Sequence, residues 1–471
     1  MPAPAPASSN PPLPWGRLAF LILAAASLLM GLDAALVRLG ALAPIASADL
    51  GTVHGILMIY GFLGTAICLE RAVALQSGAD KPRRWAYLAP FLSGAAGLSA
   101  IVVALNEPAR SLLATLPIPR FLAAHLIGFQ PARMMPGFLW TLAMGVLVAI
   151  YVHVWRTRQQ TVAVLIQGLG AVIGLGGSLL WLRGLEVPRI VPWWLMFLVI
   201  TIIGERLELA RLGFLTGGVE RRILAEACAV LAGLVAMLLT PNIGFPVLGL
   251  ALAALAVDTG WHDVARRTVN LPGLPRLAAV CMLTGYAWAL VPSLMWVIAP
   301  PAFDGYGYDA AVHALTIGFV VSMVLAHAPV IIPAVAKREV PYHPVFWLAF
   351  GILESALVVR ALAGAPSADA MRRFGGALGV MGMLVFVVAT ATVTVRRARA
   401  TGSAGSAGSA GNARVAADST DEIHTLSPEP TPSTHADPHD SVDQQHLTGK
   451  SVWVSSGQQP ETGHNPCEAT E

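Results

Sequence analysis

Long apolar stretches constrain the fold of this chain more than any other feature. A helix needs about 20 apolar residues to cross the roughly 30 Å hydrocarbon core of a bilayer, and twelve stretches approach or reach that length. Hydrophobic residues make up 55% of the 471 residues and charged residues only 12%, a balance that excludes an ordinary soluble enzyme. The predicted spans are 18–40, 52–70, 85–105, 135–155, 161–182, 188–205, 223–240, 243–258, 276–298, 310–335, 344–363 and 374–395.

The number of spans has one open alternative. The seventh and eighth stretches are short and are separated only by TPNIG, so eleven spans or a re-entrant pair also fit the pattern. With either number, the sequence predicts an all-α fold, a polytopic bundle of transmembrane helices with the lipid bilayer as its partner. The net charge of +3 gives no reason to expect a nucleic-acid partner.

Basic loops orient the predicted spans, because loops rich in Lys and Arg stay on the cytoplasmic side of a membrane. A basic cluster follows every even-numbered span. We therefore expect both termini to be cytoplasmic, in a multi-pass protein of a bacterial-type inner (plasma) membrane. The clusters are DKPRRW, WRTRQQ, GVERR, VARRTVN, AKRE and RRARA.

Composition divides the chain into three parts. Residues 1–16, rich in Pro, Ala and Ser, are predicted to be a disordered N-terminal lead, and residues 17–397 form the twelve-span transmembrane domain. From residue 398 onward, TGSAGSAGSAGN is followed by a segment rich in Pro, Ser, Thr, Asp and His. Such a segment has too little apolar surface to fold alone, so we predict a disordered cytoplasmic tail over 398–471.

Two histidines in the predicted spans indicate a cofactor site. His54 opens the second span and His313 opens the tenth, each about one helical turn from the outer surface. Imidazole is costly in hydrocarbon without a partner, and two histidines at one depth match the axial ligands of a six-coordinate haem. The alternative is that each histidine only hydrogen-bonds across helices or caps a helix start. The matched depth favours haem b.

Small and basic residues near these histidines fit the same interpretation. Gly61 lies seven residues after His54 and Gly318 lies five after His313, so each could leave room for a flat macrocycle. Glycine is also common wherever transmembrane helices pack. His125, in an outer loop, is a further candidate ligand. The arginines available near the outer surface for haem propionates are Arg110, Arg120, Arg133, Arg183 and Arg189.

His327 lies fourteen residues after His313 on the same predicted span. In a straight α-helix that spacing amounts to about 21 Å along the axis and about 40° around it, so both histidines would face one seam. A second haem, a metal ligand and a proton relay remain open for His327. So does a histidine bonded to backbone carbonyls that Pro329 and Pro333 set free.

Ionisable residues near the cytoplasmic side form a second group of candidates. GERLELAR closes the sixth span and CLERAVAL closes the second. We expect the glutamates and arginines of GERLELAR to form an ion-pair network among themselves, with Arg211 as one of its cations. Two further glutamates lie deeper in the seventh and eleventh spans, where carboxyl groups often carry protons. The candidates for ion pairs or a proton path are Glu205, Arg206, Glu208, Glu226 and Glu354.

The motifs around the two histidines resemble known families. HGILMIYGF (54–62) and HALTIG (313–318) look like the NnrS family, membrane proteins linked to haem, copper and the bacterial response to nitric oxide. More distantly, histidines in the second and tenth of twelve spans are similar to the low-spin haem ligands of haem-copper oxidase subunit I. The resemblance covers most of residues 18–395 and implies that His54 and His313 bind haem.

The chain departs from both families at other ligand positions. Haem-copper oxidases hold copper with histidines on spans six and seven, where this chain offers Glu205 and Glu226. The position of the high-spin haem ligand is Leu315 or Ala311, and Ile56 or a neighbour replaces the second histidine of NnrS span two. These departures argue against copper and against an oxygen-reducing binuclear centre.

Three functions follow from these patterns. The first is a haem-binding inner-membrane protein in a nitric oxide or redox stress response, with a redox partner protein or a small gas such as nitric oxide as its partner. The second is a haem-free, proton-linked secondary transporter using Glu226, Glu354 and His327, although no inverted repeat is obvious. The third is a structural partner of a redox subunit. The sequence leaves open whether the protein is an enzyme.

Overall fold

The computed structural model describes residues 14–76, 82–106, 131–210, 217–299, 301–364 and 368–421, and these ranges contain helices but no strand. Twelve helices among these residues are long and apolar enough to cross a membrane, which confirms the predicted fold class and makes this a multi-pass membrane protein. The spans are Trp15–Arg38, His54–Gln76, Arg84–Leu105, Ala132–Thr157, Val162–Leu182, Val187–Leu209, Gly218–Leu239, Pro241–His262, Leu274–Ile298, Gly305–Ala336, Val345–Leu362 and Asp369–Ala400.

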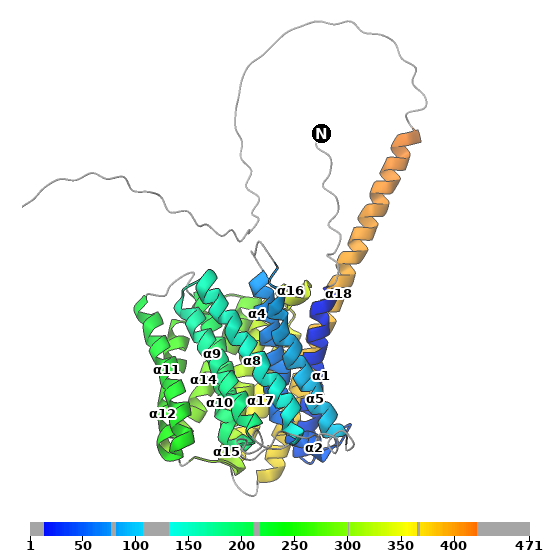
Figure 1. Ribbon diagram of the computed structural model, residues 1–471. Coiled ribbons are helices and arrows are strands. Elements are labelled where there is room, and N and C mark those ends of the chain that lie inside the picture. Colours follow the sequence, from blue (N-terminus) through cyan, green and yellow to red (C-terminus); the bar gives the residue numbers. More distant parts are fainter. Residues whose placement is uncertain are drawn as a thin grey trace, which may run out of the picture. The chain divides into compact units, whose positions relative to one another are not determined.

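Successive spans run in opposite directions and give the bundle two distinct faces. α1 (Trp15–Arg38) begins on the face where α4 (Thr65–Gln76) and α16 (Ser322–Ala336) end (Figure 1). We call this the terminal face. α2 (Ala48–Thr52) and α15 (Gly305–His313) lie on the opposite face, which we call the cavity face.

The second and tenth spans share an unusual construction. In the second span, α3 (His54–Ile56) leads into the π-helical segment η1 (Leu57–Gly64) and then into α4. In the tenth, α15 leads into the π-helical segment η3 (Ala314–Val321) and then into α16. These are the two π segments in the described part of the chain. Because π-helical turns are rare and concentrate at functional sites, the pair points to the histidine that each segment follows.

The remaining helices complete the bundle around these two spans. Prolines lie inside five of the described spanning helices, at Pro136, Pro192, Pro246 and Pro292, and at Pro329 and Pro333 in α16. The remaining elements are η2 (Arg84–Tyr87, a 3₁₀ turn), α5 (Leu88–Leu105), α8 (Pro131–Thr157), α9 (Val162–Leu182), α10 (Val187–Ala210), α11 (Gly217–Leu239), α12 (Pro241–His262), α13 (Ala265–Thr268), α14 (Leu274–Ile298), α17 (Val345–Leu362) and α18 (Asp369–Asp421).

α11 and α12 are two separate spans, which resolves the open number in favour of twelve. Thr240 alone separates them, and Pro241 starts α12 at a position where its missing N–H costs nothing. Glycines let the two helices approach closely. A Cβ at Gly233 would lie 2.8 Å from Leu248 Cα, and one at Gly244 would overlap the backbone of Met237.

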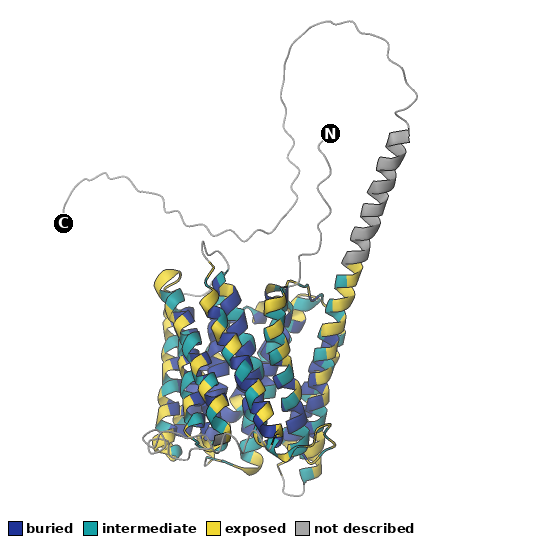
Figure 2. Cartoon of the chain, turned by 45° about the vertical axis from the view of Figure 1, so that its right-hand side comes forward, coloured by how far each residue is buried: buried dark blue, intermediate teal, exposed yellow. Residues whose placement is uncertain are grey.

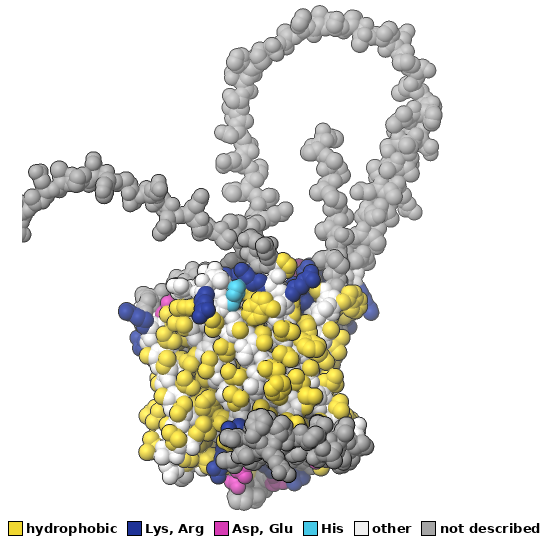
Figure 3. All heavy atoms as spheres, in the orientation of Figure 1, with side chains coloured by type: hydrophobic (Ala, Val, Ile, Leu, Met, Phe, Trp, Pro, Cys, Tyr) yellow, Lys and Arg dark blue, Asp and Glu magenta, His cyan; other side chains and the backbone are white. Residues whose placement is uncertain are grey.

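The outer surface matches a bilayer environment. Figure 2 shows buried residues gathered between the helices and exposed residues along their outer faces. Figure 3 shows a broad hydrophobic belt, with Lys and Arg side chains concentrated near its edges. Exposed apolar side chains such as Leu250, Leu294 and Val388, each 60–62% exposed, would be unfavourable in water and are ordinary in lipid.

α18 differs from the expected end of the membrane domain. The sequence predicts a disordered tail from residue 398, but the helix continues through the Gly-, Ser- and Ala-rich residues to Asp421. Extending an existing helix avoids the cost of nucleation, and the alanines in this stretch favour helix. Residues 422–471 and 1–13, which make up most of the predicted tail and lead, lie outside the described residues.

Candidate functional site

A cavity of about 1090 Å³ opens among the spans at the cavity face. Its volume lies just above the usual range for small-molecule and cofactor sites, about 300–1,000 Å³. Apolar side chains from η1, η3, α17 and α18 line its inner end, including Phe62, Val321, Leu353 and Met383. The polar residues that line it lie nearer the cavity face, and they include His54 and His313.

His54 reaches the cavity from the start of the second span. Its Nδ1 lies 2.8 Å from the backbone oxygen of Gly31 on α1. A carbonyl oxygen can only accept, so Nδ1 carries the proton and donates this bond. In the neutral ring, Nε2 then has a free lone pair, and within the described residues Nε2 has no hydrogen-bond partner. His54 therefore has its Nδ1 anchored to Gly31 and its Nε2 unprotonated, which is the usual arrangement of a ligating histidine.

His313 is anchored more elaborately. Its Nδ1 donates to the backbone oxygen of Asp309 at 2.8 Å, and the Asp309 carboxylate Oδ1 lies 3.4 Å away. Arg360 on α17 holds that carboxylate with two hydrogen bonds of 2.6 Å. The carboxylate and carbonyl together fix the ring tautomer and leave Nε2 as the unprotonated nitrogen.

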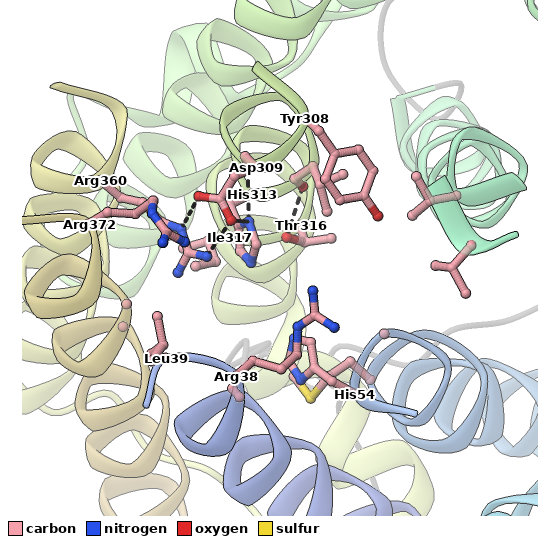
Figure 4. Close-up of a pocket in the computed structure, with 18 of the residues that line it drawn as sticks. Arg38, Leu39, His54, Tyr308, Asp309, His313, Thr316, Ile317, Arg360 and Arg372 are labelled. Atoms are coloured by element: carbon pink, nitrogen blue, oxygen red, sulfur yellow. Dashed lines mark hydrogen bonds and ion pairs between the residues drawn. The ribbon is translucent and has the colours of Figure 1, made fainter. Parts of the chain in front are cut away.

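The two imidazoles belong to one cavity. Figure 4 shows His54 and Arg38 entering from one wall, with Asp309, His313 and Arg360 on the walls opposite. Both histidines lie near the cavity face, as the expected common depth requires. η3 begins directly after His313, and η1 begins three residues after His54. The structure brings together the two residues that the sequence singled out.

Basic side chains surround the mouth of the cavity, but most have partners. Arg360 binds Asp309, Arg372 binds Asp369, and Arg133 donates to Leu185 O at 3.0 Å. Arg38, by contrast, has no hydrogen bond or ion pair within the described residues, and its guanidinium points into the cavity (Figure 4). Of the arginines expected here, Arg133 lines the cavity and Arg183 and Arg189 do not. Arg110, Arg120 and the candidate ligand His125 lie outside the described residues.

The expectation that Gly61 and Gly318 make room for a macrocycle is wrong. Neither lines the cavity. A Cβ at Gly61 would lie 2.8 Å from Ser27 Oγ of α1, and one at Gly318 would overlap the Trp288 ring of α14, so both glycines serve helix packing. Gly61 lies inside η1, whose wider turns rotate it away from the direction that a straight α-helix would give it. A spacing of five residues places Gly318 about 140° around the axis from His313 even in a straight α-helix.

The membrane domain as a whole can be compared with known families. A family model described as a domain of unknown function, DUF8744, matches residues 17–395. The chain belongs to the DUF8744 family. No curated protein and no solved structure matches it.

His327 of this DUF8744 protein lies away from the cavity, near the terminal face. Its Nε2 lies 3.1 Å from Arg206 Nη1, and its Nδ1 lies 2.6 Å from Met323 O. Arginine can only donate, so Nε2 accepts and Nδ1–H donates to the carbonyl. Both nitrogens are then occupied, which leaves none for a metal ion. The carbonyl is the one four residues back in the helix, and Pro329 and Pro333 did not free it.

The π segment η3 explains why His327 does not face the cavity with His313. The spacing of fourteen residues predicts an angular offset of about 40° in a straight α-helix. One inserted residue changes that offset to about 140°, which turns His327 away from the cavity side of the span. The expected shared seam is therefore absent.

The ion pairs on α10 also differ from the expected ones. Arg206 does not pair with Glu205 or Glu208. It binds Asp263 through Nε at 3.0 Å and Nη2 at 2.7 Å. Consecutive helix positions differ by about 100°, so Arg206 faces the end of α12 while both glutamates face Arg71 of α4. Arg211 lies outside the described residues.

The two deeper glutamates have different surroundings. Glu354 is fully paired: Oε2 accepts from Trp288 Nε1 at 2.6 Å, and Oε1 accepts from Ser322 Oγ at 3.0 Å. Glu226 lies beside the ion pair of Arg222 and Asp258, and its Oε2 is buried without a hydrogen-bond partner within the described residues. Neither glutamate lines the main cavity.

Sequence reasoning missed Asp309, Arg360 and Arg71. Asp309 carried a usable signal, because DAAVH places a carboxylate four residues before His313 on the same helix face. Arg71 stands in the noted CLERAVAL segment, but nothing in the sequence identifies α10 as its neighbour. Arg360 is a lone arginine near a span end, and such residues usually reach toward the interface.

Proposed function

We propose that this DUF8744 protein binds haem b in the cavity, with Nε2 of His54 and Nε2 of His313 as the two axial ligands. One observation carries the proposal. Two imidazoles from different spans line one cavity, and each has its Nδ1–H anchored to a carbonyl so that Nε2 is unprotonated. Ligating histidines in proteins are usually oriented in this way.

The rest of the cavity suits a haem better than a bare metal ion. The inner end is apolar, as a porphyrin ring requires, and Arg38 at the mouth is a cation available to a carboxylate. Within the described residues, no group of three or more His, Cys, Asp or Glu side chains could hold a metal ion. A haem needs only the two histidines, because the porphyrin supplies the other four nitrogens.

The residues of the chain would treat the two axial positions differently. Asp309 and Arg360 give His313 a charged support, whereas His54 is held by one neutral backbone carbonyl. A carboxylate partner raises the basicity of a ligating imidazole. His313 is therefore the firmer ligand and His54 the one that a small molecule would displace more readily.

This asymmetry fits a role in a nitric oxide or redox stress response. Haem supplies one-electron chemistry when bound, and with histidine on both sides the site suits electron transfer, or sensing of a gas that replaces His54. The NnrS-like motifs at 54–62 and 313–318 favour the same role. The basic loops favour a bacterial-type inner membrane with the terminal face toward the cytoplasm.

Absorbance spectroscopy of the purified protein tests the proposal. Protein from cells with ample haem should be coloured and show the sharp reduced bands of a six-coordinate b-type haem. His54→Ala and His313→Ala should each lose those bands, because one iron needs both ligands. His327→Ala is the matched control, since it removes a membrane histidine whose nitrogens are both occupied outside the cavity. Its spectrum should stay close to wild type.

Two results would overturn this function. Colourless wild-type protein from haem-replete cells would exclude it, as would a six-coordinate spectrum that persists in both cavity variants. Colourless protein would favour the second candidate, a haem-free proton-linked transporter, whereas a persisting spectrum would mean that other residues ligate the haem. The observation in favour of a transporter is Glu354, a carboxyl group within a span that is held only by the neutral donors Trp288 and Ser322.

A further inference from the structure

A second group of buried charges lies near the terminal face, far along the same spans from the cavity. Arg71 on α4 is its centre: Nη2 lies 2.5 Å from Glu70 Oε1 and 3.3 Å from Glu205 Oε1, and Nη1 lies 3.8 Å from Glu208 Oε2. Tyr151 of α8 completes what we call the Arg71 cluster, because its hydroxyl interacts electrostatically with Arg71, Glu205 and Glu70.

The Arg71 cluster has more negative charge than its cation can balance. Three carboxyl groups share one guanidinium, and the side chains of Glu70, Arg71 and Glu205 are only 14–18% exposed. Like charges this close, away from water, cannot all ionise. The charge count alone therefore favours a proton on one of the carboxyl groups.

The other groups that face Glu205 do not remove this imbalance. Arg206, the next cation on α10, is bound by Asp263, and His327 of α16 is neutral because it accepts from Arg206. From α9, Gln167 donates to Glu208 at 3.0 Å, which is a neutral contact. Tyr151 adds a hydroxyl and no cation.

Three buried polar atoms in the cluster lack a hydrogen-bond partner among the described residues. One is the donor Arg71 Nε, and the other two point independently to a bound proton. The Tyr151 hydroxyl is buried and has no hydrogen-bond partner among the described residues, and water cannot easily replace one because the residue is only 4% exposed. Glu205 Oε1 is also buried and is not aligned to accept from Arg71. A carboxylate in that position would lack a donor, whereas a carboxylic acid brings a donor of its own. Glu70, at 2.5 Å from Arg71, is the better placed of the two to stay ionised.

We propose that Glu205 and Glu70 form a buried site for one proton, carried by Glu205 at neutral pH and exchanged with the terminal face through Glu208. Glu208 contacts the same guanidinium and its side chain is 42% exposed, so it connects the buried pair to water. The proton comes from water at that face and returns to it, with no change in any other bond. The carboxyl groups are not arranged for a metal ion, so the ligand is a proton.

Infrared spectroscopy of the full-length protein tests this site. Wild-type protein at neutral pH should show the C=O stretch of a protonated carboxyl group, and Glu205→Gln should remove that band. Glu208→Gln is the matched control, since it changes a carboxyl group on the same helix beside the same arginine and should keep the band. Glu70→Gln makes the sharpest test. It relieves the repulsion, so Glu205 should ionise and its band should disappear even though Glu205 is still present.

The outcomes decide the proposal without reference to haem. A wild-type minus Glu205→Gln spectrum that shows only an ionised carboxylate would overturn it. So would a protonated band that survives in Glu70→Gln. A band that responds to Na⁺ at fixed pH would mean that a metal cation is the ligand and would also refute the proposal. If Glu205→Gln does not fold, as judged by size-exclusion chromatography, the Glu70→Gln spectrum alone still decides. Haem-free protein serves equally well, so this test and the absorbance test fail separately.

Discussion

Asp263 joins α10, α14 and the connection between α12 and α13, and its replacement by Asn should destabilise the protein. It lies between α12 and α13 with a side chain only 1% exposed. Its carboxylate accepts from Arg206 Nε and Nη2, from the Tyr286 hydroxyl at 2.8 Å and from the backbone N–H of Ala265 at 2.8 Å.

The expected loss of stability follows from what Asp263→Asn leaves behind. Arg206 is only 9% exposed, and its other partner, His327, is neutral. Removing one partner of a buried ion pair costs about 3–5 kcal/mol, because the other charge stays buried without compensation. Removing both charges, in Arg206→Met with Asp263→Asn, should recover much of this loss for the same reason.

A second ion pair provides the control. Arg222 and Asp258 form two hydrogen bonds of 2.6 and 2.5 Å, which are shorter than those of Arg206 and Asp263. The Arg222 side chain is 53% exposed, however, so water and salt screen the pair. Asp258→Asn should therefore change stability far less than Asp263→Asn, despite the shorter distances.

Unfolding in mixed micelles, with a denaturing detergent as the perturbant and far-ultraviolet circular dichroism as the readout, measures all four proteins under one condition. Burial decides the ranking in our reasoning. If Asp258→Asn proves as damaging as Asp263→Asn, or if the double variant is no more stable than the single one, that reasoning is refuted.

Acid should reduce the difference between wild type and Asp263→Asn. Burial raises the pKa of the Asp263 carboxyl, but the hydrogen bonds and charge of Arg206 lower it by more, so its pKa lies below the usual value. A group with a lowered pKa stabilises the fold fully above its unfolded pKa, about 3.9 for Asp. That stabilisation is lost as pH falls through the folded pKa. The stability difference should therefore be constant above about pH 5 and shrink below about pH 4.

Three further predictions concern topology, the end of the chain and the cavity. Reporter fusions at Arg158 should read cytoplasmic and fusions at Pro301 external, and the reverse pattern would contradict the assigned orientation. Truncation after Ala400 keeps all twelve spans, so membrane yield and bound haem should match those of the full chain; a loss of either would show that the remainder contributes. Asp309→Asn should weaken haem binding by about 10- to 100-fold through His313. It should also raise the midpoint potential, because a less basic imidazole and the loss of a negative charge stabilise the oxidised iron less, whereas an unchanged affinity and potential would show that Asp309 has only a structural role.

The sequence predicts the membrane architecture well because each span depends on composition alone. Twenty apolar residues identify a span wherever its neighbours lie, and all twelve predicted spans are present. The common depth of His54 and His313 was predictable for a related reason. The depth of a residue follows directly from the membrane face on which its span starts and from the distance of the residue from that start.

What could not be predicted depends on rotation about helix axes and on which helices are neighbours. The roles of Gly61 and His327 were wrong because nothing in the residue pattern signals a π-helical turn, and one such turn changes every later position on the span. Arg206 pairs with Asp263, which is 57 residues away, and only the packing of α10 against the end of α12 brings them together.

The two π segments also determine where spans two and ten can change in length. In a regular α-helix, deleting one residue turns everything beyond the deletion by about 100° and so moves side chains off their partners. A π segment already contains a surplus residue, and its loss would restore an ordinary α-helical turn while both flanks keep their directions. The cavity histidine on one flank and the terminal-face residue on the other, Arg71 or His327, therefore keep independent helical registers. One residue can therefore be lost at the π segment of either span without turning one end of the span relative to the other.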